Sequence, residues 1–163
     1  MHKTDTALFA AGCFWGVQYY FDQVPGVTKT TVGYTGGDSK NPDYDKVATG
    51  KTGHAEAVLV TFDPAIVSYE TLVKHFFRMH DPTQFERQGP DIGDEYRSAI
   101  FYSSEEQHKI AVQVRNQTQK HLGMPIVTEI ASAGSFYPAE SFHQKFTERT
   151  GLGMCHISYA PVG

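Results

Sequence analysis

The first apolar positions of the chain predict a strand followed at once by a helix. Residues 7–11 form a short apolar run closed by Gly12, which is typical of a buried strand that ends in a tight turn. The apolar positions 14, 17 and 21 then recur at helical spacing until Pro25. Cys13 is therefore expected at a strand-to-helix junction.

The middle of the chain predicts two more strands and a strongly amphipathic helix. Residues 27–34 are rich in Thr, Val and Tyr, and residues 55–62 alternate so that Glu56 shares a face with Val58, Val60 and Phe62. Apolar side chains then recur at i, i+3, i+4, i+7 and i+8 from position 69, after the N-cap Ser68. We expect this helix to stop at Asp81-Pro82.

The remainder predicts a strand over 98–102, a helix over 104–123 that opens with a capping box, and a strand over 126–131. A last helix is expected from Pro138, at its first position, to Gly151. Residues 35–53 and 81–97 lack periodicity. Loops of that length in a compact domain are usually functional.

The first six elements run strand, helix, strand, strand, helix, strand. This order predicts an α+β fold of two layers, a ferredoxin-like (split βαβ) plait with an additional C-terminal helix and an irregular tail. In the ideal plait we expect the first and third strands to be parallel neighbours, which would leave Cys13 far from Glu56. We therefore expect the sheet to depart from the ideal if these two residues act together.

Size and charge bound the class of protein. The chain has 163 residues and a net charge of −4, and we expect a single catalytic domain over 1–163. No apolar stretch approaches the roughly 20 residues of a membrane span, and the mild acidity does not favour nucleic acid. Neither a membrane nor a nucleic acid is expected as a partner.

Cysteine usage and the start of the chain suggest a compartment. Two cysteines, 142 residues apart, without a recognisable secretory signal, indicate reactive or buried thiols instead of a disulfide framework. We expect a cytoplasmic protein.

Two residues stand out chemically. A thiol at a helix N-terminus meets unpaired N–H groups and the positive end of the helix dipole, which stabilise the thiolate, so Cys13 is a candidate nucleophile. Glu56 shares its strand face with apolar residues, where burial would keep its carboxyl protonated as a general acid. The pattern also allows the strand's start to be exposed and Glu56 to be solvated.

Aromatic and loop residues could complete a site. Phe14 and Trp15 would present apolar rings beside the sulfur, although either ring could instead belong to the core. Tyr44, Asp91 and Tyr96 fall in the two long loops, where a phenol could hold a polar oxygen beside an apolar group. No C-x-x-C or H-E-x-x-H pattern occurs, so no metal site is predicted.

Several motifs resemble one known family. The pentapeptide Gly12-Cys13-Phe14-Trp15-Gly16 is similar to the hallmark of the peptide methionine sulfoxide reductase A family. Other segments resemble the family in the same order and spacing, over about residues 7–157: Thr52 to Val58, His80 to Thr83, Gln88 to Asp91, Tyr96 to Ile100 and Phe136 to Glu140.

The resemblance implies a function and a set of roles. Cys13 would attack the sulfoxide sulfur of a methionine-S-sulfoxide, in a protein, a peptide or the free amino acid, and Glu56 would protonate its oxygen. Tyr44, Asp91 and Tyr96 would hold that oxygen, while Phe14 and Trp15 would cage the methyl group.

The resemblance also implies how the enzyme is recycled. Cys13 would be left as a sulfenic acid, which Cys155 would resolve to a disulfide reduced by thioredoxin, or by dithiothreitol in vitro. No bound cofactor and no oligomer are implied, so we expect a monomer. The sequence ends eight residues beyond Cys155, without a further recycling cysteine. Alternatively, Cys155 is a packed thiol and an external thiol reduces Cys13 directly.

Two other functions compete with this hypothesis. A cysteine hydrolase or acyltransferase would use Cys13 on a carbonyl with His54 or His80 as base, and it predicts a trapped thioester. A binding module would hold a methyl or thioether group in the aromatic pocket, and it predicts affinity without turnover.

Overall fold

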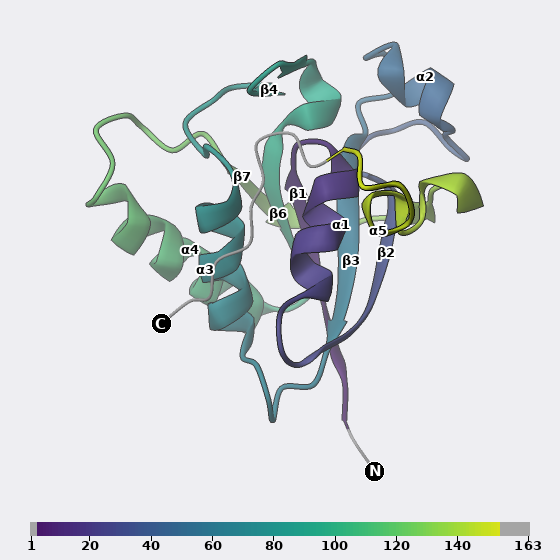
Figure 1. The fold of residues 1–163 in the computed structure, drawn as a ribbon. Helices are drawn as coiled ribbons and strands as arrows, with labels where there is room; N and C mark the ends of the chain where they lie inside the picture. Colours follow the sequence, from purple (N-terminus) through teal and green to yellow (C-terminus); the bar gives the residue numbers. More distant parts are fainter. Residues whose placement is uncertain (1–2, 154–163) are drawn as a thin grey trace.

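The protein is built on a curled, mixed sheet of six strands (Figure 1). The computed structural model describes residues 3–153. The strands lie in the order β7 (Glu129–Ser132), β6 (Ser98–Tyr102), β1 (Asp5–Ala11), β3 (Ala55–Phe62), β2 (Val27–Thr35) and β8 (Phe136–Pro138). All neighbouring strands are antiparallel except β6 and β7, which are parallel. The α+β class predicted from the sequence is confirmed.

The helices and smaller elements occupy the connections between strands. The helices are α1 (Phe14–Asp22), α2 (Tyr44–Ala48), α3 (Tyr69–Met79), α4 (Glu105–Gln119) and α5 (Phe146–Thr150). Short 3₁₀ turns are η1 (Asp94–Tyr96) and η2 (Ser141–His143), and β4 (Arg87–Gln88) pairs with β5 (Asp91–Ile92) in a separate hairpin. Figure 1 shows α1 and α3 lying across one face of the sheet. Among residues 3–153, no helix combines the length and the apolar character that crossing a membrane requires.

The alternation along β3 divides the interior into two clusters. Val58, Val60 and Phe62 face the main core, which they share with apolar side chains of α1 and α3. Ala55 and Ala57 face a smaller cluster on the opposite side of the sheet. Because Glu56 has the same parity as Val58, its carboxyl is carried on the helix-covered side.

The premise that a plait has parallel first and third strands was wrong, because a βαβ crossover makes the first two strands parallel and the third strand pairs antiparallel with the second. The structure pairs β1 with β3 in the antiparallel sense, with Phe9 opposite Val58. The end of β1 therefore lies beside the start of β3, because antiparallel neighbours exchange ends. The separation that parallel strands would have imposed on Cys13 and Glu56 does not arise, in agreement with the expectation that the sheet brings the two residues together.

The helix predicted from Pro138 to Gly151 was wrong in its first half, whereas its end is confirmed by α5, which has Gly151 as C-cap. Residues up to Pro138 form strand β8 on β2, where Pro138 lies opposite Gly33. A side chain at Gly33 would overlap the Tyr137 carbonyl, so glycine allows the two backbones to approach. The turn η2 follows, and Lys145, with φ of 58°, precedes the short helix α5.

Other boundaries differ by smaller amounts. The segment 35–53 contains the short helix α2, begun by Asp43, whose side chain accepts from the Lys46 amide. The segment 81–97 contains the β4–β5 hairpin and η1. The predicted helix 104–123 ends at Gln119, and the predicted strand 126–131 begins at Glu129.

Candidate active site

Cys13 lies at the tight turn that joins β1 to α1. Gly12 has φ of +96°, a conformation that glycine adopts without a steric penalty. Cys13 is the N-cap residue of α1 and is 9% exposed. Its side chain is thus carried at the positive end of the helix dipole, which favours a thiolate over a thiol.

Glu56 comes from the neighbouring strand to the same helix end. Its Oε1 accepts a hydrogen bond from the backbone N–H of Phe14 at 3.2 Å, so the carboxyl is bound to the residue that follows Cys13. Glu56 is 3% exposed. The alternative that this carboxyl is solvated is therefore wrong.

Burial gives Glu56 the protonation state of an acid. Desolvation raises its pKa to about 8, and the nearby carboxyls of Glu95 and Asp91 add to the rise, while the Phe14 N–H opposes it. Most of the population is consequently protonated at pH 7. Since Oε1 already accepts from Phe14, Oε2 is the oxygen left to carry the proton.

Tyr44 and Tyr96 bring two phenols to this carboxyl from separate loops. Tyr44 begins α2, Tyr96 ends η1, and the two phenols lie close enough to influence each other electrostatically. Burial raises the pKa of both phenols, and the charge of Glu56 raises them further. Both groups also lie within electrostatic range of Cys13. The phenols therefore keep their protons and remain hydrogen-bond donors.

Asp91 completes the polar side of the cluster. It lies on β5, is half-buried, and interacts electrostatically with Glu56 and with both tyrosines. Its Oδ2 is buried and accepts no hydrogen bond within residues 3–153. A buried acceptor without a donor is costly, so this oxygen suits a donor supplied by water or by a bound molecule.

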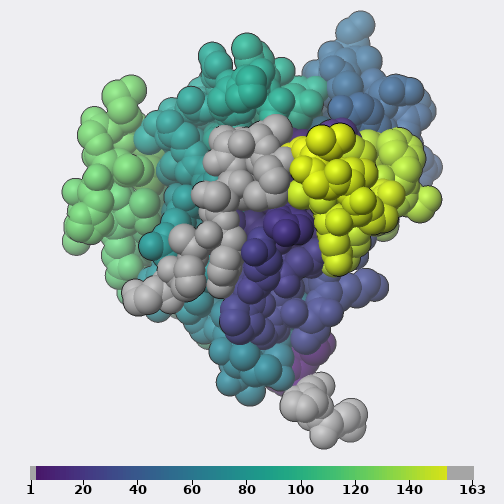
Figure 2. All heavy atoms as spheres, in the orientation of Figure 1, coloured from purple at the N-terminus to yellow at the C-terminus, as the bar shows by residue number. Residues whose placement is uncertain are grey.

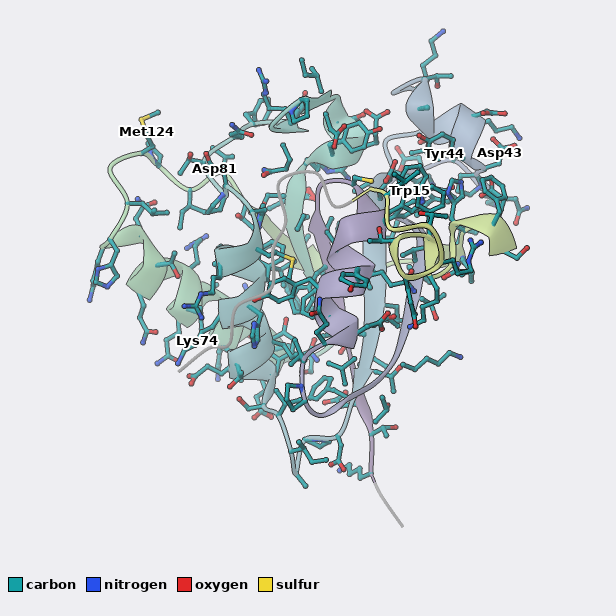
Figure 3. The ribbon with its side chains drawn as sticks, in the orientation of Figure 1. Trp15, Asp43, Tyr44, Lys74, Asp81 and Met124 are labelled. Carbon is teal, nitrogen blue, oxygen red and sulfur yellow. The ribbon has the colours of Figure 1, made fainter. Side chains whose placement is uncertain are left out.

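Aromatic rings form the apolar side. Phe14 is fully buried in the main core, whereas Trp15 is half-buried. The Trp15 ring stacks on Phe146 with centroids 4.0 Å apart and on Tyr44 with centroids 6.5 Å apart. Figure 3 shows Trp15 and Tyr44 side by side. Trp15 is thus the ring of the pair that keeps an accessible apolar surface.

Sequence reasoning missed two residues, Glu140 and His143, that hold this cluster. Glu140 accepts from the Tyr34 hydroxyl at 3.0 Å and from the Tyr44 backbone N–H at 3.3 Å. Burial alone would raise the pKa of Glu140, but hydrogen bonds from its own backbone, Tyr34 and Tyr44 lower it overall. His143 accepts from the Trp15 indole at 2.9 Å. Glu140 closes a motif quoted above, so its position could have drawn attention to the segment.

The two histidines considered as bases have structural partners. In His54, Nδ1 accepts from the Gly37 N–H at 3.1 Å and Nε2 lies 2.6 Å from the Ser39 carbonyl, which fixes the loop after β2. In His80, Nδ1 lies 2.7 Å from the Phe76 carbonyl and Nε2 lies 2.7 Å from the Ser98 hydroxyl. These contacts give neither ring the role that a cysteine hydrolase would need.

The remaining predictions have different outcomes. Cys155 lies outside the described residues. Within residues 3–153, no group of three or more His, Cys, Asp or Glu side chains is arranged to hold a metal ion. A surface depression of about 710 Å³ is lined only by α4 and its C-cap, away from the cluster around Cys13.

Comparison with known proteins decides the family. Residues 5–162 match the model of the family described as peptide methionine sulfoxide reductase. The chain belongs to the peptide methionine sulfoxide reductase family. This family comprises oxidoreductases that reduce peptide methionine sulfoxide, and the chain is an enzyme of this class.

Individual reductases are similar over most of the chain. The peptide methionine sulfoxide reductase MsrA of Methanosarcina mazei is 51% identical over 150 residues, covering 91% of this chain and 71% of that protein. Mxr1 of Saccharomyces cerevisiae in reduced form has a TM-score of 0.91 at 31% identity, covering 98% of this chain and 93% of that one. Mxr1 in complex with Trx2 has a TM-score of 0.63 at 25% identity, covering 88% and 85%.

Proposed function

We propose that this reductase acts on the S epimer of methionine sulfoxide, with Cys13 as nucleophile and Glu56 as acid. The observation that carries the proposal is the hydrogen bond from Phe14 N–H to the buried carboxyl of Glu56. It ties a protonated acid to the helix end that bears the thiol. A sulfoxide bound there would meet a nucleophile at sulfur and a proton at oxygen.

The first step transfers one oxygen. The Cys13 thiolate attacks the sulfoxide sulfur while the Glu56 carboxylic acid protonates the sulfoxide oxygen. The attack forms a bond between the Cys13 sulfur and the substrate sulfur, and the protonated oxygen becomes a hydroxyl group. This hydroxyl then passes to the Cys13 sulfur as its bond to the substrate sulfur and the sulfur–sulfur bond both break, which releases methionine and leaves Cys13 as a sulfenic acid. The cysteine sulfur is oxidised by two electrons and the methionine sulfur is reduced by two.

The surrounding side chains would hold the substrate during this step. The phenols of Tyr44 and Tyr96 donate hydrogen bonds toward the oxygen, and Asp91 orders a donor beside it. Trp15, backed by the buried Phe14, would contact the methyl group. Hydrogen bonds that strengthen as negative charge develops on the oxygen lower the barrier instead of only tightening binding.

Recycling would use the second cysteine. The Cys155 thiol attacks the Cys13 sulfenic acid, a disulfide forms and water leaves. Thioredoxin then reduces the disulfide. The similarity to Mxr1, described in complex with Trx2, supports a thioredoxin as the physiological reductant. Because both thiols must return to the reduced state, a cytoplasmic setting fits the cycle.

The architecture supports a further part of the proposal. We take the four strands β6, β1, β3 and β2, with α1 and α3 on one face, as a split plait to which β7 and β8 are added. Its support is their order and their alternating directions. One domain acting as a monomer would suffice, since Cys13, Glu56, Tyr44, Asp91 and Tyr96 come from one chain.

Turnover of separated epimers tests the function. Methionine formation is measured from each epimer of a blocked methionine sulfoxide with excess dithiothreitol, for the native chain, Cys13→Ser and Cys155→Ser. We expect turnover of the S epimer only, abolished by Cys13→Ser and retained by Cys155→Ser. Lack of turnover of either epimer by folded native protein would refute the proposal. Thioester trapping would then test for a hydrolase, and equilibrium binding would test for a binding module.

A further inference from the structure

The indole of Trp15 has one specific polar contact. Its Nε1–H donates to Nδ1 of His143 at 2.9 Å. An indole nitrogen can only donate, so Nδ1 of His143 must be the acceptor. The imidazole is therefore neutral, with its proton on Nε2. Burial lowers the pKa of His143, against an opposing effect of Glu140, which is consistent with that neutral form.

His143 is buried among the aromatic rings of the site. It is 1% exposed, and its ring centroid lies 4.7 Å from that of Tyr44, 5.6 Å from Trp15 and 5.3 Å from Phe14. Its Nε2 has no hydrogen-bond partner within residues 3–153. Burying an imidazole in this way is costly, and the contact with Trp15 is the polar interaction that the described structure shows for it.

The turn η2 explains how one short segment holds both Tyr44 and Trp15. Glu140 is the N-cap of η2 and His143 is its last residue, so the two are spaced i, i+3 and project from the same side of a 3₁₀ turn. Glu140 holds the backbone N–H of Tyr44, and His143 holds the indole of Trp15. Figure 2 shows the segment that follows this turn, coloured yellow, against the surface of α1.

We propose that His143 is the positioning residue for Trp15, and that it thereby sets which group the enzyme accepts on the sulfoxide sulfur. This inference rests on the proposed function, in which Trp15 contacts the substrate methyl group. Trp15 is half-buried and stacks on Phe146, so part of the ring remains accessible, and the hydrogen bond to His143 fixes its rotation. Without the acceptor the ring gains freedom, the methyl pocket loses its fixed wall, and a larger group fits more easily.

The test replaces the acceptor in two ways. His143→Leu removes it, whereas His143→Asn retains an oxygen near the position of Nδ1. Ser141→Ala, an exposed change in the same turn, is the matched control. Because Trp15 is the only tryptophan of the chain, its indole N–H gives a single NMR cross-peak whose shift and hydrogen exchange report the contact without any activity.

We expect His143→Leu to move the indole resonance and speed its exchange, and His143→Asn and Ser141→Ala to leave it close to native. Loss of one hydrogen bond corresponds to about a fivefold change. The KM for the methyl sulfoxide should therefore rise about fivefold in His143→Leu. The preference for methyl over ethyl sulfoxide should fall by a similar factor, with kcat for the methyl substrate nearly unchanged.

Trp15→Phe keeps the test decisive if His143→Leu does not fold. It removes the donor from the other side of the contact, so the same loss of preference for methyl over ethyl is expected. Where both variants fold, adding His143→Leu to Trp15→Phe should produce no further loss. The inference would be overturned if the folded variants kept the native preference for methyl over ethyl sulfoxide. It would also be overturned if the indole resonance of Trp15 were the same in His143→Leu as in the native protein. If the native protein reduced neither sulfoxide, the proposed function would be overturned instead. The NMR measurement would still test the hydrogen bond between Trp15 and His143.

Discussion

Glu56→Gln should stabilise the folded protein while it disables the enzyme. The carboxyl is 3% exposed and its pKa rises from 4.5 to about 8, so the folded state retains a proton that the unfolded chain releases above pH 4.5. Stability therefore falls as pH rises between these two values, because the native state binds more protons than the unfolded state. Glutamine cannot ionise, so the variant escapes this loss.

The size of the effect follows from the same shift. Each pH unit between the two pKa values costs the native protein about 1.36 kcal/mol. Relative to pH 4, the variant should gain about 3 kcal/mol over the native protein at pH 7, and about 5 kcal/mol above pH 8. Its amide oxygen can still accept from Phe14 N–H, so the local hydrogen bond is retained.

Urea unfolding of the two proteins at several pH values, from 4 to 9, measures the difference. Glu148→Gln, which removes an exposed carboxylate, controls for the change in net charge. A difference between native protein and Glu56→Gln that stays constant with pH would refute the assignment of a buried, protonated Glu56. In the same samples, loss of the acid should lower kcat by roughly 100-fold or more.

Three other changes give separate expectations. The native kcat/KM should decline as pH rises through about 8, the pKa of Glu56, and a pH–rate profile flat from 6 to 9 would contradict this. Tyr96→Phe, which leaves Tyr44 as the remaining phenol, should reduce kcat/KM roughly 10-fold or more in steady-state assays. An unchanged kcat/KM would argue against a role of Tyr96 in holding the sulfoxide oxygen. Ser98→Ala removes the hydroxyl that lies 2.7 Å from His80 Nε2 and 2.8 Å from the Thr128 hydroxyl. The free energy of unfolding measured in urea should fall by about 1–3 kcal/mol, with kcat preserved. An unchanged unfolding midpoint would mean that this buried network adds no stability.

Periodicity correctly predicted the elements whose apolar pattern lies entirely within a short stretch of sequence. The strand 55–62 and the strand 98–102 have the predicted bounds, and α3 begins after the cap Ser68, whose hydroxyl accepts from the Thr71 amide. In each case the residues that decide the structure are adjacent in sequence. Local pattern is sufficient there because side-chain direction follows directly from the backbone period.

The errors arose where partners distant in sequence decide the structure. Pro138 is a favourable first helical residue, yet the residues before it pair with the edge of β2, and that pairing overrides the local preference. The relative direction of β1 and β3 depends on topology and not on either strand's own residues. Because the two strands are antiparallel, the end of β1 that carries Cys13 lies beside the start of β3 that carries Glu56.

The residues of the candidate site also divide into those that a local pattern predicts and those that only distant contacts reveal. Cys13 and Glu56 were predicted because each stands out in its own element, one at a helix start and one on an apolar face. His143 contacts Trp15 across 128 residues and Glu140 contacts Tyr34 across 106, so no local pattern marks them. Residues whose role is to hold other residues become visible only when the fold is known.

A single turnover without reductant tests most directly whether the Cys13 thiol takes the oxygen of the sulfoxide. Reduced native protein, Cys155→Ser and Cys13→Ser are each mixed with excess S-sulfoxide, and methionine, thiols and sulfenic acid are quantified. We expect one methionine per chain from the native protein with a Cys13–Cys155 disulfide, and one from Cys155→Ser with a trappable sulfenic acid on Cys13. Cys13→Ser should form none. Methionine formed by Cys13→Ser, or formed by Cys155→Ser without oxidation of Cys13, would contradict the mechanism.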